Sequence, residues 1–214
     1  MLRYIYGNDL DRYPLLRDTM FRDRADQFSH RLKWDVSVDN AGFERDEYDD
    51  MNPLYAIWVT EAGVHGGSMR FLPTVGPTMV HDHFPHLTGG VHIESPLIWE
   101  CTRFCLAPQS ARNVTAGLVL AAGEIMENFH LSHFVGVFDP RMERIYRMFG
   151  LNPDVIGTDG TGAAQISVGL WEMKKSAWPD ILKRAGVSRK DSREWFQQSI
   201  YTASQQVNRE PEVA

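Results

Sequence analysis

The strongest constraint on the fold of this chain is a run of three consecutive segments in its second half. Residues 114–131 are apolar over a length typical of a buried helix, and residues 133–138, HFVGVF, are typical of a buried strand. Asp139 and Pro140 then provide an N-cap and a proline at the first position of a helix that ends at Gly150. This succession of helix, strand and helix predicts an α/β fold.

Segments on both sides extend this prediction to the whole chain. Strands are expected over residues 2–6, 54–60, 66–74, 97–106 and 164–173, and helices over residues 11–27 and 188–206. Strands and helices alternate only in part, which favours a mixed, twisted sheet flanked by helices. The 214 residues, 43% of them hydrophobic, are enough for one core, so we expect a single domain over residues 1–214 with a flexible tail at 207–214.

Charge and cysteine content exclude several classes of protein. The net charge of −6 argues against nucleic-acid binding through bulk electrostatics. No apolar run is long enough to span a membrane, and the N-terminus carries charges where a signal peptide is apolar. Cys101 and Cys105 are spaced as C-x-x-x-C, which matches neither a zinc knuckle nor a redox pair. We therefore expect a reduced, cytoplasmic protein that binds neither nucleic acid nor a membrane.

Two segments invite a ligand-site interpretation that their context does not support. His81, His83 and His86 lie close together in a proline-rich loop, but no H-E-x-x-H motif or cysteine accompanies them. We expect no metal site there and assign these histidines no role. Residues 157–163, GTDGTGA, precede a strand instead of a helix, so they predict a turn and not a phosphate-binding loop.

The strand predicted over residues 97–106 carries two charges among apolar residues. Glu100 and Arg103 are costly to bury unless they are paired, so they form either a structural ion pair or part of a functional site. Strict alternation places them on opposite faces of the strand. Both can reach one cleft only if a bulge or a strong twist intervenes.

A second concentration of chemically active groups lies between residues 24 and 70. Arg24, Phe28 and Trp34 precede an acidic segment, ERDEYDD, and Arg70 follows on a strand. Aromatic faces attract cations and stack on flat rings, carboxylates bind amino or ribose groups, and arginine binds a carboxylate. The set would suit a zwitterionic ligand with a cationic centre and a flat ring. The alternative is a solvated acidic loop beside a helix end.

Taken together, these residues resemble the signature of the acyl-homoserine-lactone synthases, the autoinducer synthases of the LuxI type. The family pattern R-x-x-x-F-x-x-x-x-x-W is matched at 24–34, and the pattern E-x-D-x-Y/F-D at 44–49. Arg70 matches a strand arginine, and the motif E-x-[ST]-R-F is matched at 100–104. The resemblance implies a fold similar to N-acetyltransferases, with a V-shaped cleft between central strands.

The resemblance also implies a reaction and its participants. S-adenosylmethionine (SAM) would give its α-amine to an acyl thioester of an acyl carrier protein or of CoA. The SAM carboxylate would then attack its own γ-carbon, closing the lactone and releasing 5′-methylthioadenosine. SAM is a substrate here, so no cofactor is expected. The rivals are an acyl-CoA-dependent N-acyltransferase acting on another amine, and a non-catalytic regulator that binds SAM or lipid.

Candidate residues follow from the matched positions, with residues 1–50 as the N-terminal segment of the SAM site. Glu100, as general base, and Arg103 are the catalytic candidates. The SAM-binding candidates are Arg24, Phe28, Trp34, Asp46, Asp49, Arg70 and Phe104.

The acyl side rests on fewer matches. Its candidates are Cys101, Thr102, Gly136 and Tyr146. Gly136 stands where family members that prefer 3-oxo chains carry threonine, and its small size is expected to leave room for unsubstituted or 3-hydroxy chains. Arg141, Arg144 and Arg147 recur every third residue on one helix and are candidates for docking an acidic carrier protein, unless they are simply a solvated helix face.

Overall fold

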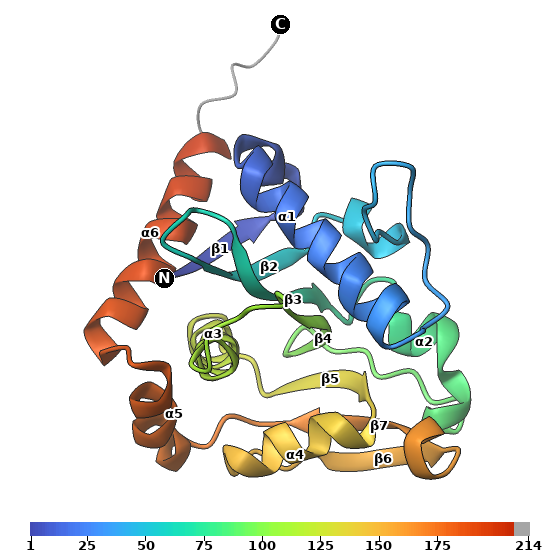
Figure 1. Cartoon of the computed structure of the whole chain (residues 1–214). Coiled ribbons are helices and arrows are strands. Elements are labelled where there is room, and N and C mark those ends of the chain that lie inside the picture. The colour runs from blue at the N-terminus through green and yellow to red at the C-terminus, as the bar shows by residue number, and fades with distance from the viewer. Residues whose placement is uncertain (208–214) are drawn as a thin grey trace, which may run out of the picture.

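A single seven-stranded sheet organises the computed structural model, which describes residues 1–207, with side chains to residue 200. The strand order is β1-β2-β3-β4-β5-β7-β6 (Figure 1). The strands are β1 (Leu2–Tyr6), β2 (Leu54–Val59), β3 (His65–Pro73), β4 (Ile98–Leu106), β5 (His133–Phe138), β6 (Asp154–Asp159) and β7 (Ile166–Trp171).

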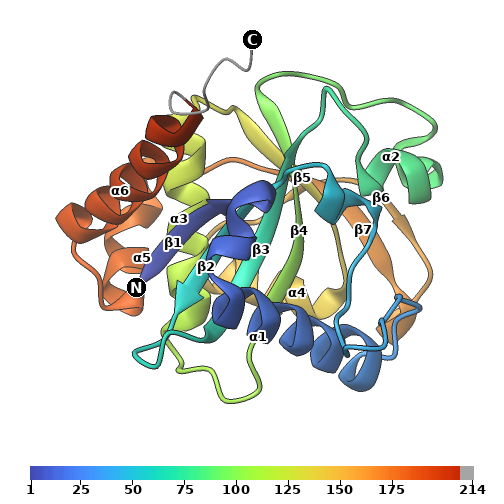
Figure 2. The same ribbon diagram turned by 90° about the horizontal axis from the view of Figure 1, so that it is seen from above.

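Helices cover both faces of this sheet (Figures 1 and 2). They are α1 (Pro14–Ala25), α2 (Met79–His83), α3 (Val114–Asn128), α4 (Pro140–Met148), α5 (Trp178–Ala185) and α6 (Arg189–Val207). The larger core packs α3 and α5 against β1–β3. Most residues of α3 are buried in it, as the apolar sequence of this helix predicts. A second core lies under α1, and a third joins α2 to β5 and β7. The predicted architecture, one mixed sheet flanked by helices, is confirmed.

Among the described strands, one neighbouring pair is parallel, and the sheet is split there. Strands β4 and β5 are in register only from Ile98↔His133 to Glu100↔Val135, whereas the other neighbours pair antiparallel over most of their lengths. The pairing ends at Glu100, and past Cys101, which still faces Gly136, no described residue of β4 is in register with β5. This separation opens a V-shaped cleft in the middle of the sheet.

A bulge interrupts β4 at the same point. Ser68 is in register with Cys105 and Arg70 with Thr102, so that two residues of β4, Arg103 and Phe104, face one residue of β3. Arg103 adopts a φ of 54°, in the left-handed region that non-glycine residues rarely occupy. The sequence predicted that Glu100 and Arg103 could reach one cleft only through a bulge or a strong twist. The structure contains the bulge.

Several local predictions were wrong. The first helix starts at Pro14 instead of residue 11, and after Ala25 it continues as a π-helical turn, Asp26–Arg31. The apolar segment after residue 114 leaves its helix at Asn128. Strand β6 and helix α5 were missed, and the proline-rich loop contains α2. Residues 208–214 of the predicted tail lie outside the described residues, and no described helix is both long and apolar enough to cross a membrane.

Candidate active site

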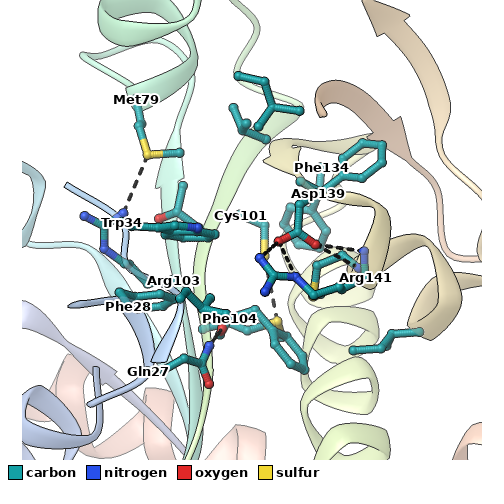
Figure 3. A pocket seen from close by; sticks show the side chains of 18 of the residues that line it. Gln27, Phe28, Trp34, Met79, Cys101, Arg103, Phe104, Phe134, Asp139 and Arg141 are labelled. Carbon is teal, nitrogen blue, oxygen red and sulfur yellow. Dashed lines mark hydrogen bonds and ion pairs between the residues drawn. The ribbon is translucent and has the colours of Figure 1, made fainter. Parts of the chain in front are cut away.

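A cavity of about 950 Å³ occupies the cleft between β4 and β5. Figure 3 shows Phe28, Trp34 and Arg103 on one side of it and Phe134 and Asp139 on the other. Of the residues predicted for the site, those on the cavity wall are Phe28, Trp34, Asp46, Cys101, Thr102, Arg103, Phe104, Arg141 and Tyr146. The structure thus brings together residues that are more than 100 positions apart in the sequence.

Behind one wall of this cavity, Arg24 organises a buried ion-pair network. Its Nε donates to Glu44 at 2.6 Å, and its two terminal nitrogens each donate to Asp49 at 2.9 Å. Tyr55 also donates to Asp49, at 2.5 Å. Burial opposes ionisation of Asp49, but the neighbouring Arg24 and Arg70 hold its pKa below the usual range.

Arg70 continues the network toward the cavity. It is fully buried and donates to Asp49 at 2.8 Å, to Asp46 at 2.9 Å and to the Thr102 hydroxyl at 3.0 Å. Neither Arg24, Asp49 nor Arg70 is among the described residues that line the cavity. These three candidates hold the wall in place from behind.

Arg103 is the arginine of the network that reaches the cavity. Its guanidinium pairs with Glu44 at 2.9 Å and with Asp46 at 2.7 Å, and Nη1 lies 3.6 Å from the sulfur of Met79. Arg24, Arg70 and Arg103 together balance the charges of Glu44, Asp46 and Asp49, so the network is neutral as a unit. The carboxylate and the ammonium of a bound zwitterion would therefore form ion pairs with side chains whose positions the network already fixes.

Two aromatic rings lie on the same wall as Arg103. The Phe28 and Trp34 rings are stacked, with centroids 5.1 Å apart and planes 11° apart, and the Arg103 guanidinium lies 5.5 Å from the Phe28 ring. Phe28 is buried, whereas Trp34 is 43% exposed. The π-helical turn and the left-handed Lys33 after it (φ 58°) bring the two rings together, and the Trp34 N–H donates to the Phe28 carbonyl at 2.9 Å, although the spacing of six does not fit an α-helical face.

Glu100 lies deeper than a group in direct contact with a ligand. Its carboxylate is 1% exposed and accepts hydrogen bonds from the backbone N–H groups of Met79 (3.0 Å) and Val80 (2.7 Å). Burial raises the pKa of Glu100 to about 7, although these two bonds act in the opposite direction. Within the described chain it is not part of the cavity wall, although Cys101 and Thr102, which follow it, are.

The other arm of the cavity is apolar and rich in aromatic rings. Phe138, Tyr146 and Trp171 contact one another with ring centroids 4.8–5.7 Å apart. Burial raises the pKa of the Cys101 thiol to about 12, so this wall residue is an unreactive apolar group. The sulfur of Met126, also on the wall, accepts the backbone N–H of Met173 at 3.2 Å.

The expectation of open space beside Gly136 was wrong. A Cβ atom built there would lie 2.7 Å from the carbonyl oxygen of Cys101, which faces it from β4. Gly136 is also absent from the cavity wall as the described residues define it. The glycine permits close approach of two strands and does not enlarge the cavity.

The three arginines of α4 differ in their surroundings. Arg141 lines the cavity and pairs with Asp139, the N-cap of its own helix, through Nε at 2.9 Å. Arg144 and Arg147 are exposed, and neither forms an ion pair with another described residue. Arg141 is exposed as well but is paired with Asp139, whereas Arg144 and Arg147 have no ion-pair partner among the described residues.

The histidine-rich loop contributes to the rim of the cavity. His83 lines the cavity and contacts Glu47 at 3.1 Å, His81 and His92 are adjacent, with ring centroids 4.1 Å apart, and His86 lies 3.6 Å from Asp159. Across the described residues, no group of three or more His, Cys, Asp or Glu side chains is arranged to hold a metal ion.

Sequence reasoning missed three residues that shape the site. Glu44 bridges Arg24 and Arg103, Tyr55 braces Asp49, and Gln27 binds the backbone of β4. Glu44 was visible as the first position of the acidic pattern. The sequence offered no signal for Tyr55 or Gln27, because their partners come from distant segments.

Known proteins are similar to this chain in both sequence and fold. A model of the autoinducer synthase family matches residues 9–177. An acyl-homoserine-lactone synthase of Rhizobium etli is 34% identical over 180 residues, covering 81% of this chain and 84% of the relative.

Solved structures agree with this match. The CoA-dependent acyl-homoserine lactone synthase BjaI, solved with SAM and isopentyl-CoA, superimposes with a TM-score of 0.77 at 21% identity, over 87% of this chain and 90% of that one. A protein of Lactobacillus plantarum assigned to the N-acetyltransferases shares the fold, with a TM-score of 0.51 at 14% identity over 79% and 96% of the two chains. The cleft, the neutral arginine–carboxylate network and these matches agree: the chain belongs to the acyl-homoserine-lactone synthase family.

Proposed function

We propose that the cavity binds SAM at its charged end and an acyl chain at its apolar end, and that the protein joins them into an N-acyl-L-homoserine lactone. The observation that carries this proposal is the arrangement of Arg103, Asp46 and the stacked Phe28–Trp34 pair on one wall of a cavity whose other arm is apolar. SAM has a carboxylate, an amine, a sulfonium and a purine, and each has a matching group here.

The SAM end takes its specificity from the cavity wall. The Arg103 guanidinium pairs with the SAM carboxylate, and Asp46 accepts from the amine or the ribose. Phe28 and Trp34 attract the sulfonium and stack on the adenine. Phe104 packs beside them, while Arg24, Asp49 and Arg70 keep these groups oriented from behind the wall.

Glu100 serves as the proton acceptor in this scheme. The SAM ammonium must lose a proton before its nitrogen attacks the thioester carbonyl, and a carboxyl with a pKa near 7 is poised to accept it. Because the carboxylate is 1% exposed, the proton reaches it through a bridging water. The amine forms the amide bond as the thiolate leaves.

Lactone formation needs mainly positioning. The SAM carboxylate attacks the γ-carbon, the carbon–sulfur bond breaks, and 5′-methylthioadenosine leaves as a neutral thioether. No cofactor takes part. The acyl chain lies against Cys101, Thr102 and Tyr146, which line the cavity near the cleft.

The acyl donor is a thioester of CoA or of an acyl carrier protein. BjaI, solved with isopentyl-CoA, supports the first and the exposed Arg144 and Arg147 support the second. We place the enzyme in the cytoplasm, where both donors are made, as one domain whose first 50 residues contribute to the SAM site.

The test is product analysis with SAM and a panel of acyl-CoA and acyl-carrier donors. Mass spectrometry is expected to find an acyl-homoserine lactone and 5′-methylthioadenosine in equal amounts. Acylation of another amine without 5′-methylthioadenosine would identify an N-acyltransferase. SAM binding with no product from any donor would identify a non-catalytic regulator.

A further inference from the structure

Past the end of its pairing with β5, strand β4 has a free edge that faces the cleft. Ala107 N–H donates to Gly66 of β3 at 3.1 Å, so the backbone groups of alternate residues, Phe104 and Leu106, point to the other edge. The parallel pairing with β5 has already ended at Glu100. Unpaired backbone groups at such a site leave the strand free to shift or straighten.

The side chain of Gln27 occupies this edge. Its Nε2 donates to the carbonyl of Phe104 at 2.7 Å, and its Oε1 accepts from the N–H of Leu106 at 3.0 Å. Gln27 is 8% exposed and lies on the cavity wall (Figure 3). One primary amide thus supplies the donor and the acceptor that a neighbouring strand would have supplied.

These two bonds join both halves of the proposed SAM site. Gln27 precedes Phe28 in the π-helical turn, and Phe104 follows Arg103 in the bulge. The Arg103 guanidinium lies 5.5 Å from the Phe28 ring. Arg103 holds a left-handed φ of 54°, which persists only where the surroundings fix it. Gln27 fixes it from the backbone side, as Glu44 and Asp46 do from the side-chain side.

We propose that Gln27 is a positioning residue for SAM: by pairing with the free edge of β4, it holds the bulge that directs Arg103 toward the SAM end of the cavity. The inference rests on the proposed function, because it assumes that SAM binds beside Arg103 and Phe28. Gln27 itself takes no part in bond making.

The test compares Gln27→Met, which has a similar length but no hydrogen-bonding group, with Gln109→Met, an exposed site after β4. Gln27→Met is expected to raise the KM for SAM about tenfold, with kcat and the KM for the acyl donor changed less than about twofold. Hydrogen exchange at the Leu106 amide should become faster in the same variant. Gln109→Met should change none of these values.

Two results would overturn the proposal. The first is a KM for SAM that stays at the wild-type value while the Leu106 amide exchanges faster. The second is an equal rise in both KM values accompanied by a lower unfolding midpoint, which indicates a purely structural role.

Calorimetric titration with SAM alone separates this proposal from the proposed function. If the wild type binds SAM but forms no lactone, the proposed function fails, and the affinities of wild type and Gln27→Met for SAM still decide the role of Gln27. If the wild type does not bind SAM, both fail.

Discussion

Thr102 and Arg103 are consecutive in β4, yet their side chains reach the same face of the sheet. The Thr102 hydroxyl accepts a hydrogen bond from Arg70, and the Arg103 guanidinium pairs with Asp46, to which Arg70 is also bound. The left-handed backbone of Arg103 reverses the alternation of the strand at this point. An ordinary strand would place Arg103 on the opposite face, away from its carboxylate partners.

Replacement of Arg24 should destabilise the fold, because the ion-pair network around it is buried. Arg24→Met leaves Glu44 and Asp49 buried with one cationic partner fewer, and we expect it to lower the free energy of unfolding by about 3–5 kcal/mol. Urea denaturation measures this. The control is Arg22→Met, an exposed site on the same helix, which should change stability by less than about 0.5 kcal/mol. Equal effects of both substitutions would contradict the role of the network.

The parts of the site that the sequence revealed are those that lie within short motifs. The residue types between 24 and 70 indicated a zwitterion site, and the charges at 100 and 103 indicated an ion pair or a functional site. The structure places members of both segments around one cavity. The alternation of the strand also indicated that Glu100 and Arg103 could reach one cleft only through a bulge or a strong twist. The sequence could not reveal that Arg24, Asp49 and Arg70 lie behind the wall, because depth depends on how distant segments pack.

The elements that were missed are short or lack a pattern. Helix α2 has five residues and follows a proline-rich segment, and β6 is mostly exposed and therefore shows no apolar alternation. The close contact of Gly136 with Cys101 depends on the distance between two strands, which composition does not encode.

The pH dependence of the reaction should reflect Glu100. With a pKa of about 7, this carboxyl is protonated below neutral pH and can accept a proton only above it, so kcat/KM should fall as the pH drops through about 7. Glu100→Gln should lower kcat/KM about a hundredfold and abolish this dependence. Glu94→Gln, in an exposed loop, is the control. Persistence of the acidic limb in Glu100→Gln would assign it to another group.

A separate pH effect on stability should come from His65. Its ring contacts Asp23 at 2.6 Å and Ser68 at 3.0 Å, and burial lowers its pKa from 6.5 although Asp23 acts in the opposite direction. The unfolded chain takes up this proton more readily than the folded one. The stability that the neutral His65 ring contributes is therefore fully present above pH 6.5 and is lost as the pH falls below it.

For one proton, the free energy of unfolding changes by up to about 1.4 kcal/mol per pH unit. Urea denaturation at a series of pH values across this range measures the change. His65→Gln should give a flatter profile than wild type, whereas His30→Gln, at an exposed position, should not. A wild-type slope retained in His65→Gln would show that another group titrates.

Gly136 should tolerate no side chain. Gly136→Ala places a Cβ 2.7 Å from the carbonyl oxygen of Cys101, and we expect a loss of about 1–3 kcal/mol in the free energy of unfolding, with a larger loss for Gly136→Thr. Gly76→Ala is the control, because its Cβ would lie 4.0 Å from the nearest atom, a carbonyl oxygen of Pro73. A stable Gly136→Thr variant with a changed ratio of 3-oxo to unsubstituted products would instead restore this position to the acyl site.

Charge reversal on α4 should change the KM for the acyl carrier protein but not the KM for SAM. Arg144 and Arg147 are exposed beside the face of α4 that carries Met142 and Ile145 into the cavity. The double substitution Arg144→Glu/Arg147→Glu is expected to raise the KM for an acyl carrier protein about tenfold and to leave the KM for SAM unchanged, because only the carrier meets this surface. Added salt should reduce the difference between wild type and variant.

The control for this double variant is Lys183→Glu/Lys190→Glu, which reverses two exposed charges on α5 and α6. It changes the net charge by the same amount but lies on helices outside the cavity wall, so both KM values should stay at the wild-type level. An equal rise in the two KM values for the α4 variant would mean that it distorts the cavity, and the carrier protein would then dock elsewhere.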